Sequence, residues 1–426
     1  MIIRLLFCYT RSVKNTGIIK ILIVSVLLLS GVGCFFFEDP EEKLRLEEEA
    51  RQQRIAEISE HYSSQVVTQG ESALYDKQED DYVAVGKIGK GEVLDLATTV
   101  IDENTEYFYS ESLKTYLNYQ SVLPDVSTVS FNDRHLNYIP FDQSIKAEGK
   151  IRLYNDNYEL IYELPSRESY PILIKEDEAY GIDYNGRLLW VLKSDEPIIE
   201  SVKNSTKKKA KGIRVLCYHQ IYKPKVKMCY KIICHSTKQM SSHFGYLKKH
   251  NYFTMSMQEV LWFIDGKINV PYKSTCLTFD DGGKNTRYLI ELLEKYDLHG
   301  TLFLIGKKYK DYMISDNLEL QAHTYNFHTK GHCGKTPFGA AHMCKSKKAF
   351  LADLIKDKEL TNAIAFAYPY YEYNKQTIKT VKEAGFLLAF EDNHGFVRKG
   401  SNKFTISRFT FVSSSTLQDL KNVLHP

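Results

Sequence analysis

The sequence has almost no excess of charge of either sign. Its 56 lysine and arginine residues nearly balance 53 aspartate and glutamate residues, so the 426-residue chain has a net charge of +3. Nucleic-acid-binding domains usually show a strongly basic balance, so nothing here calls for a nucleic-acid partner. With 43% hydrophobic and 13% aromatic residues, the chain can bury ordinary cores, which excludes a wholly disordered protein. Its length predicts roughly two or three domains.

A zinc-finger spacing of cysteines is also lacking. Beyond the N-terminal segment there are six cysteines, Cys217, Cys229, Cys234, Cys276, Cys333 and Cys344. Their spacings match no zinc-finger pattern. The stretches "CYKIICH" and "GHCGKTPFGAAHMC" mix cysteine with histidine, which leaves a second, structural metal open, although lone cysteines are usually small buried hydrophobes. Disulfide pairing among the six is not assigned from sequence.

Residues 1–37 differ from the rest of the chain. Four basic residues precede the apolar run "ILIVSVLLLSGVGCFFF", which extends from Ile21 to Phe37. This pattern is typical of an export signal or a signal anchor. "SGVGC" around Cys34 resembles a bacterial lipoprotein signal, in which the cysteine is lipidated; an uncleaved anchor and cleaved secretion stay open as alternatives. All three place the rest of the chain outside the cytoplasm, and the first two tether it to the outer face of the bacterial cell membrane.

Composition and periodicity then divide the chain. Residues 38–78 are charged and rich in helix formers, which predicts a helical stalk or linker. Two stretches of short alternating strands with glycine turns, 79–125 and 126–201, predict two small β-domains. They resemble Src-homology-3-like modules of bacterial wall enzymes and would serve as wall-polymer contacts or as spacers. Residues 202–212 form a lysine-rich linker, and 213–426 form the predicted catalytic domain.

From Ile213 onward, strand-like runs alternate with helix-like runs. "IRVLCYHQI", "STCLTFDDGG" and "GTLFLIG" are apolar, and "NTRYLIELLEKYD" and "NKQTIKTVKEAG" are typical of helices. Repeated β-then-α units predict a parallel sheet, and in about 210 residues we expect it to close as a barrel. The chemistry of such barrels lies at the carboxyl ends of the strands.

Those strand ends supply Asp280, Asp281, His323, His328 and His219. Two imidazoles and one carboxylate with open positions suit a divalent metal and a water. A metal lowers the pKa of bound water towards about 7, and a second, adjacent carboxylate is suited to accept the proton. Each piece has a structural alternative, since an Asp-Asp-Gly is often a capped turn and a histidine is often a satisfied core residue.

These residues resemble the motifs of the NodB-type polysaccharide deacetylases, carbohydrate esterase family 4. "TFDDG", "HTYNFH" and "FAYPYYEYN" are similar to the three family motifs. The resemblance covers Ile213 to roughly Val412 and implies a distorted (β/α) barrel. It implies Asp280 as general base and Asp281, His323 and His328 as metal ligands. The third motif would line the substrate groove with Tyr368, Pro369 and Tyr370, the last donating its backbone N–H to an oxyanion.

Within this family the chain is most similar to the poly-N-acetylglucosamine deacetylases of biofilm systems. The metal histidines are five residues apart, and "LCYHQI" resembles the opening strand in which an early histidine is the general acid, here His219. The family arginine that orients the base is absent upstream of the third motif, and Arg408 is the proposed substitute. Tyr371 replaces the usual glycine.

The resemblance therefore implies a metal-dependent hydrolase that removes N-acetyl groups from GlcNAc units of a cell-envelope polysaccharide, either poly-β-1,6-N-acetylglucosamine or peptidoglycan. Zinc is the expected metal, with nickel, cobalt or iron as alternatives. We expect a monomer. Two other functions stay open: a catalytically impaired wall-glycan-binding module, favoured by the missing arginine, and an O-acetyl esterase acting on a glycan.

Overall fold

The computed structural model describes residues 41–42, 44–46, 48–50, 52–53, 65–79, 81–95, 107–124, 133–226, 229 and 231–425. The predicted signal segment, residues 1–37, lies outside the described residues, and so do lipidation and anchoring at Cys34. The described residues between 41 and 53 are helical and exposed. Among all described residues, no helix combines the length and the apolar character that crossing a membrane would require.

Regular strand structure begins at Gln65, ahead of the predicted start at residue 79. All ladders among the described residues before 201 are antiparallel. The strands are β1 (Gln65–Thr68), β2 (Ser72–Gln78), β3 (Asp81–Ile88), β4 (Val93–Asp95), β5 (Tyr107–Ser110), β6 (Thr115–Asn118), β7 (Val122–Pro124), β8 (Ser144–Ile145), β9 (Lys150–Tyr154), β10 (Leu160–Pro165), β11 (Tyr170–Lys175), β12 (Ala179–Tyr184), β13 (Arg187–Leu192) and β14 (Ile199–Glu200).

The two predicted β-domains share one sheet. Its order is β14-β8-β11-β12-β13-β9-β10-β3-β2-β6-β5, and a smaller sheet has the order β4-β1-β7. The two halves of the large sheet meet where Tyr162 of β10 lies opposite Ile88 of β3. One hydrophobic cluster contains residues from both halves, among them Leu74, Phe108, Leu153 and Ile182. Residues 65–201 therefore form a continuous all-β region.

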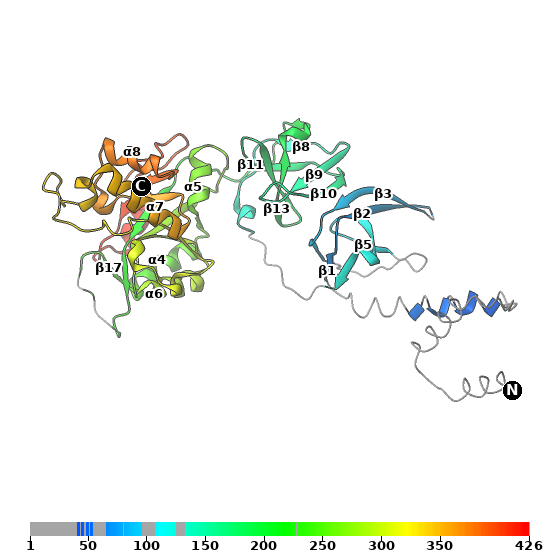
Figure 1. Cartoon of the computed structure of the whole chain (residues 1–426), viewed down its shortest axis with the longest axis horizontal. Helices are drawn as coiled ribbons and strands as arrows, with labels where there is room; N and C mark the ends of the chain where they lie inside the picture. Colours follow the sequence, from blue (N-terminus) through cyan, green and yellow to red (C-terminus); the bar gives the residue numbers. More distant parts are fainter. Residues whose placement is uncertain are drawn as a thin grey trace, which may run out of the picture.

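This β-region packs directly on the catalytic region. Figure 1 shows β8 to β13 lying between the β1–β5 part and the helices of the C-terminal half. Arg134 Nη2 donates to Glu259 Oε2 at 2.6 Å, and Ile174 forms a bridge with Ile268. A single hydrophobic cluster includes Ile174 and Trp190 from one side and Ile268 from the other. The two regions thus share a core.

The predicted linker, residues 202–212, is part of this packing. Ala210 is buried, and its backbone N–H donates to the Val270 carbonyl at 2.9 Å. Lys209 forms an antiparallel bridge with Pro271. The segment that reads as a polar spacer in sequence is therefore fixed to the edge of the catalytic region.

The catalytic region is a curled parallel sheet with helices, as predicted. Its order is β23-β22-β21-β20-β19-β15-β24, and β18 pairs with β19. Phe390, at the end of β23, bridges Ile406 in parallel, so the segment before β24 nearly closes the barrel. The strands are β15 (Arg214–Tyr218), β18 (Phe253–Thr254), β19 (Ser274–Asp281), β20 (Gly300–Leu304), β21 (Leu318–Ala322), β22 (Ala365–Ala367), β23 (Leu388–Phe390) and β24 (Phe409–Thr410); a separate pair is β16 (Gln220–Tyr222) and β17 (Cys234–Ser236).

The central strand β19, "STCLTFDD", is buried at every residue. Both faces are covered, as expected for an interior parallel strand, and its apolar run is nearly continuous for that reason. The helices are α4 (Thr237–Lys249), α5 (Met257–Ile264), α6 (Thr286–Tyr296), α7 (Lys347–Thr361), α8 (Lys375–Glu383) and α9 (Leu417–Leu424). Side chains of Ser256, Asn374 and Thr416 complete capping boxes at α5, α8 and α9, satisfying backbone N–H groups of the first turns.

Four of the six cysteines form disulfides, Cys229–Cys234 and Cys333–Cys344. The two cysteine–histidine stretches that left a second metal open therefore carry disulfides. Cys217 and Cys276 are free and buried, as expected for small hydrophobic residues in a core.

Candidate metal centre and catalytic residues

The two aspartates stand at the carboxyl end of β19, where the chain turns sharply. Asp281 has φ +80° and Gly282 has φ +70°, a left-handed backbone that glycine adopts without penalty. A Cβ on Gly282 would lie 2.5 Å from Leu304 Cδ1. The turn starts at Asp281, the last residue of β19, whereas Asp280 lies one residue earlier in the strand.

Asp281, His323 and His328 form a cluster with the composition of a metal site. Their ligand atoms all lie within 4.8 Å of one another. Asp281 Oδ1 is 3.3 Å from His328 Nε2 and 3.8 Å from His323 Nε2, and this buried oxygen has no hydrogen-bond partner among the described residues. A buried carboxylate oxygen facing two imidazole nitrogens fits a divalent cation.

The surroundings of His323 and His328 favour the neutral form of both rings. The Ala367 carbonyl accepts a hydrogen bond of 2.8 Å from His323 Nδ1, which leaves the Nε2 lone pair free to face Asp281. Burial and, to a lesser extent, the neighbouring His328 lower the pKa of His323 to about 3. Burial also lowers the pKa of His328. Both rings are therefore uncharged at neutral pH, the state in which imidazole binds metals.

Asp280 is held by Arg408 in the interior of the barrel. Arg408 Nη1 donates to Asp280 Oδ1 at 2.7 Å, and Nη2 donates to Oδ2 at 2.8 Å. The two residues are 0% and 1% exposed. Burial favours a raised pKa for the Asp280 carboxyl, but the Arg408 charge and the nearby histidines lower it well below its usual value. Arg408, just before β24, is thus in contact with the predicted base, and its role in place of the arginine missing before the third motif stays a prediction.

His219 follows β15, and its Nε2 approaches the same oxygen of Asp280 as His323 Nε2 does. Its Nε2 is 4.0 Å from Asp280 Oδ2, and its side chain is 12% exposed. His219 Nδ1 is buried without a hydrogen-bond partner in the described part of the chain. The Tyr371 ring lies edge-on to His219 at 6.5 Å between centroids. The structure therefore brings the predicted acid beside the predicted base.

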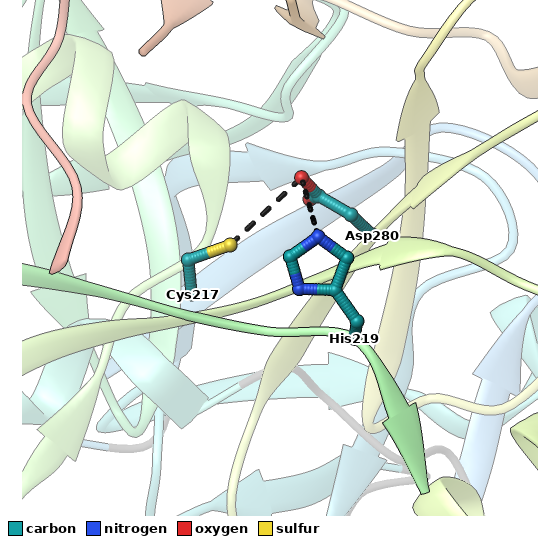
Figure 2. Close-up of side chains that lie close together, drawn as sticks. All are labelled: Cys217, His219 and Asp280. Atoms are coloured by element: carbon teal, nitrogen blue, oxygen red, sulfur yellow. Dashed lines mark hydrogen bonds and ion pairs between the residues drawn. The ribbon is translucent and has the colours of Figure 1, made fainter. Parts of the chain in front are cut away.

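A second trio, Cys217, His219 and Asp280, also satisfies the spacing of a metal cluster. Figure 2 shows the thiol and the imidazole both pointing toward the carboxylate, with Cys217 Sγ 3.8 Å from Asp280 Oδ2. Burial raises the pKa of Cys217 to about 12, so the thiol keeps its proton, whereas metals bind the thiolate. Arg408 already occupies both oxygens of Asp280, which leaves Asp281, His323 and His328 as the better ligand set.

The third motif contributes unequally to the site. Tyr370 has φ +56° and Tyr371 φ +62°, and the Tyr370 ring lies 4.6 Å from the His328 ring. Tyr368, in contrast, is fully buried, and its hydroxyl donates to the Phe404 carbonyl at 3.2 Å. Pro369 is also buried. The Tyr368 side chain therefore belongs to the core beneath the groove, while Tyr370 faces the metal ligands.

Two carboxylates that the sequence motifs do not mark hold the loop of the second motif. Asp353 of α7 accepts hydrogen bonds from the backbone N–H groups of Tyr325 at 2.8 Å and Asn326 at 2.9 Å. One turn later, Asp357 accepts from the His323 N–H at 2.9 Å. Both are buried. Their spacing of four residues places both carboxylates on one face of α7, and the prediction from sequence did not mark this stretch.

Comparison with known proteins agrees with the geometry. The family model for polysaccharide deacetylase matches residues 267–389, which contain the two aspartates, the two metal-site histidines and Tyr370. His219 and Arg408 lie outside the matched segment, so their assignment rests on the motif resemblance and their contacts. A poly-β-1,6-N-acetyl-D-glucosamine N-deacetylase of Staphylococcus aureus is 24% identical over 208 residues, covering 43% of this chain and 70% of the relative.

Two solved structures also resemble part of this chain. IcaB from Ammonifex degensii superposes with a TM-score of 0.44 at 20% identity, covering 52% of this chain and 100% of that structure. The Streptococcus pyogenes deacetylase PplD in complex with acetate superposes with a TM-score of 0.41 at 20% identity, again covering 52% and 100%.

Proposed function

Because residues 267–389 match the family model for polysaccharide deacetylase, we propose that this protein removes N-acetyl groups from GlcNAc units of poly-β-1,6-N-acetylglucosamine and releases acetate. The supporting observation is the cluster of Asp281, His323 and His328 beside Asp280, whose carboxylate Arg408 clamps. The similarity to an N-deacetylase named for this polymer favours it over peptidoglycan.

Asp281, His323 and His328 would hold a divalent metal, with zinc as the expected ion. When bound, such a metal supplies Lewis-acid activation of a water and of the acetamide carbonyl. Asp280 takes the proton of the attacking water. Arg408 uses one acceptor site on each Asp280 oxygen, Cys217 contacts Oδ2, and a carboxylate has about four such sites, so Oδ1 can still accept a proton. Arg408 also keeps the carboxylate ionised and fixes its orientation.

His219 gives a proton to the departing nitrogen, so the sugar leaves as an amine while acetate keeps the carbonyl carbon. His219 lies beside Asp280 with its Nε2 turned toward the carboxylate. The proposed proton donor and proton acceptor are therefore close together, next to the ligand cluster. The Tyr370 backbone N–H is the proposed donor to the carbonyl oxygen as it gains charge.

Acetate release by the purified full chain tests this function. We expect acetate from β-1,6-linked GlcNAc oligomers after zinc, cobalt or nickel is added, with less from peptidoglycan fragments and from O-acetylated xylan. His323→Ala should lose metal and activity together. Asp280→Asn should keep the metal, because the three proposed ligands are Asp281, His323 and His328, and should lose roughly 10²–10⁴-fold in kcat. Asp316→Asn, an exposed aspartate, is the matched control.

Wild-type rates in Asp280→Asn would overturn the assignment of the base. Faster acetate release from the O-acetylated glycan would make the protein an esterase. Bound metal without acetate release from any of these substrates would support the wall-glycan-binding alternative.

The role of His219 has its own test. Replacement by Gln should lower kcat on the GlcNAc oligomer by about 10²–10⁴-fold, because an amine is a poor leaving group without a proton. The aryl oxide of an aryl acetate ester can depart without being protonated, so the hydrolysis of such an ester should fall much less. Equal losses on both substrates would indicate that His219 acts on the attacking water or on the fold instead.

A further inference from the structure

The loop between His328 and α7 is built around one buried carboxylate. Glu372 is 8% exposed and accepts three hydrogen bonds from this loop, from Thr336 Oγ1 at 2.7 Å, Phe338 N at 2.7 Å and Ala340 N at 2.8 Å. Its backbone carbonyl lies 2.8 Å from His342 Nε2. Three donors on a buried carboxylate fix a loop far more firmly than solvent-exposed turns do.

A disulfide closes the same loop. Cys333 and Cys344 are bonded, and between them Gly339, at φ +64°, packs so tightly that a Cβ would lie 2.9 Å from the Cys333 carbonyl oxygen. The backbone N–H of Cys333 donates to the Gly339 carbonyl at 3.1 Å. The loop therefore has a definite shape that its own bonds maintain.

This rigid loop presents an exposed aromatic ring. Phe338 is 55% exposed, and it is the only phenylalanine in the described part of the chain with so large an exposed fraction. Its ring stacks on Tyr370 at 6.2 Å with an interplanar angle of 28°. Tyr370 in turn lies 4.6 Å from the ring of His328. Three rings thus lead from the metal ligands to the surface.

A single exposed apolar side chain is common on protein surfaces and carries no meaning alone. Phe338 differs because a buried carboxylate, a disulfide and a ring contact with the active-site wall hold it in place. An aromatic group fixed in this way loses little conformational freedom when it binds a ligand, so more of the contact energy appears as affinity.

We propose that Phe338 forms a sugar subsite next to the reaction centre, where its ring stacks on the pyranose adjacent to the unit being deacetylated. The inference rests on the proposed function, since a polymer substrate must extend beyond the reacting sugar. The axial C–H groups of a β-linked GlcNAc ring form an apolar face that an aromatic ring can cover. The Cys333–Cys344 disulfide and Glu372 position the ring. Because the subsite binds a neighbouring sugar unit, activity should depend on the length of the glycan.

Binding and turnover by the full-length protein test this subsite. Binding is measured by calorimetry in an Asp280→Asn background, with GlcNAc and with its β-1,6-linked tetramer as ligands. Phe338→Ala should weaken tetramer binding by about threefold to tenfold, the range expected for loss of one stacked ring. Monosaccharide binding should be unchanged. Phe338→Trp should retain tetramer affinity, and Cys333→Ser with Cys344→Ser should show the same length-dependent loss.

Tyr272→Ala is the matched control, because Tyr272 is 48% exposed but precedes β19 at the opposite end of the strand from the site. Equal tetramer affinity in Phe338→Ala and its parent would overturn the subsite, as would equal losses for monomer and tetramer. If the wild type releases no acetate from GlcNAc oligomers, the proposed function fails as well; if it does release acetate while Phe338→Ala behaves like its parent, only the subsite fails.

Discussion

Arg408 brings a charge into the centre of the barrel, where Asp280 is its partner at 2.7 and 2.8 Å. Breaking a buried pair by removing one member typically costs about 3–5 kcal/mol, because the remaining charge has no compensation. Arg408→Met should therefore lower the free energy of unfolding by about that much at neutral pH and abolish activity. Arg408→Lys keeps the charge but not the two-pronged contact. Its free energy of unfolding, measured in urea, should lie between those of the wild type and Arg408→Met.

The same pair predicts a pH dependence. The pKa of Asp280 is below its unfolded value of 3.8, so the native state binds fewer protons, and the pair stabilises the fold fully above pH 3.8. This contribution is lost as the pH falls below that value. The difference in unfolding free energy between wild type and Arg408→Met, measured with a chelator present, should stay constant from pH 6 to pH 4 and shrink as the pH is lowered below 3.8. A difference that stayed constant below that pH as well would show that the charge pair is not its source.

At the scale of elements, α7 acts as a support for the second-motif loop. Asp353 accepts two backbone hydrogen bonds from that loop, and outer groups that orient metal ligands typically contribute about 10–100-fold to affinity. Asp353→Ala should weaken zinc binding by that factor in a competition titration while the far-UV circular dichroism stays unchanged. Glu359→Ala, an exposed position on the same helix, should leave zinc affinity at the wild-type value.

Elements also show where sequence reasoning succeeds and where it stops. Strand ends carrying "FDD" and "HTYNFH" predict the metal cluster, because parallel strands bring their carboxyl ends to one edge. Arg408 was proposed from the motif resemblance, but its contact with Asp280, 128 positions away, is a tertiary contact that no local pattern establishes. The α7 carboxylates were missed for the same reason, and so was the pairing of β10 with β3, which depends on register between strands far apart in sequence.

At the scale of the whole molecule, the β-region and the barrel share a core. Arg134 bonds to Glu259, and Trp262 donates its indole N–H to Glu176, so a cut at residue 201 removes partners of buried groups. A fragment of residues 202–426 should unfold at a lower temperature than residues 133–426, and it should aggregate more readily because the apolar surface around Ile268 becomes exposed. Identical thermal transitions would mean that the contact adds no stability.

Asp281 ends β19, whereas His323 and His328 follow β21, and α6 and β20 lie between them in the chain. The cluster exists only after three strands have paired in order, so no short unfolded segment can reproduce it. A ligand that binds only the folded form raises apparent stability by mass action. The amount of metal bound at saturation would therefore report how many molecules have a folded barrel. The stoichiometry of a titration would give the folded fraction of a preparation together with its concentration of competent sites.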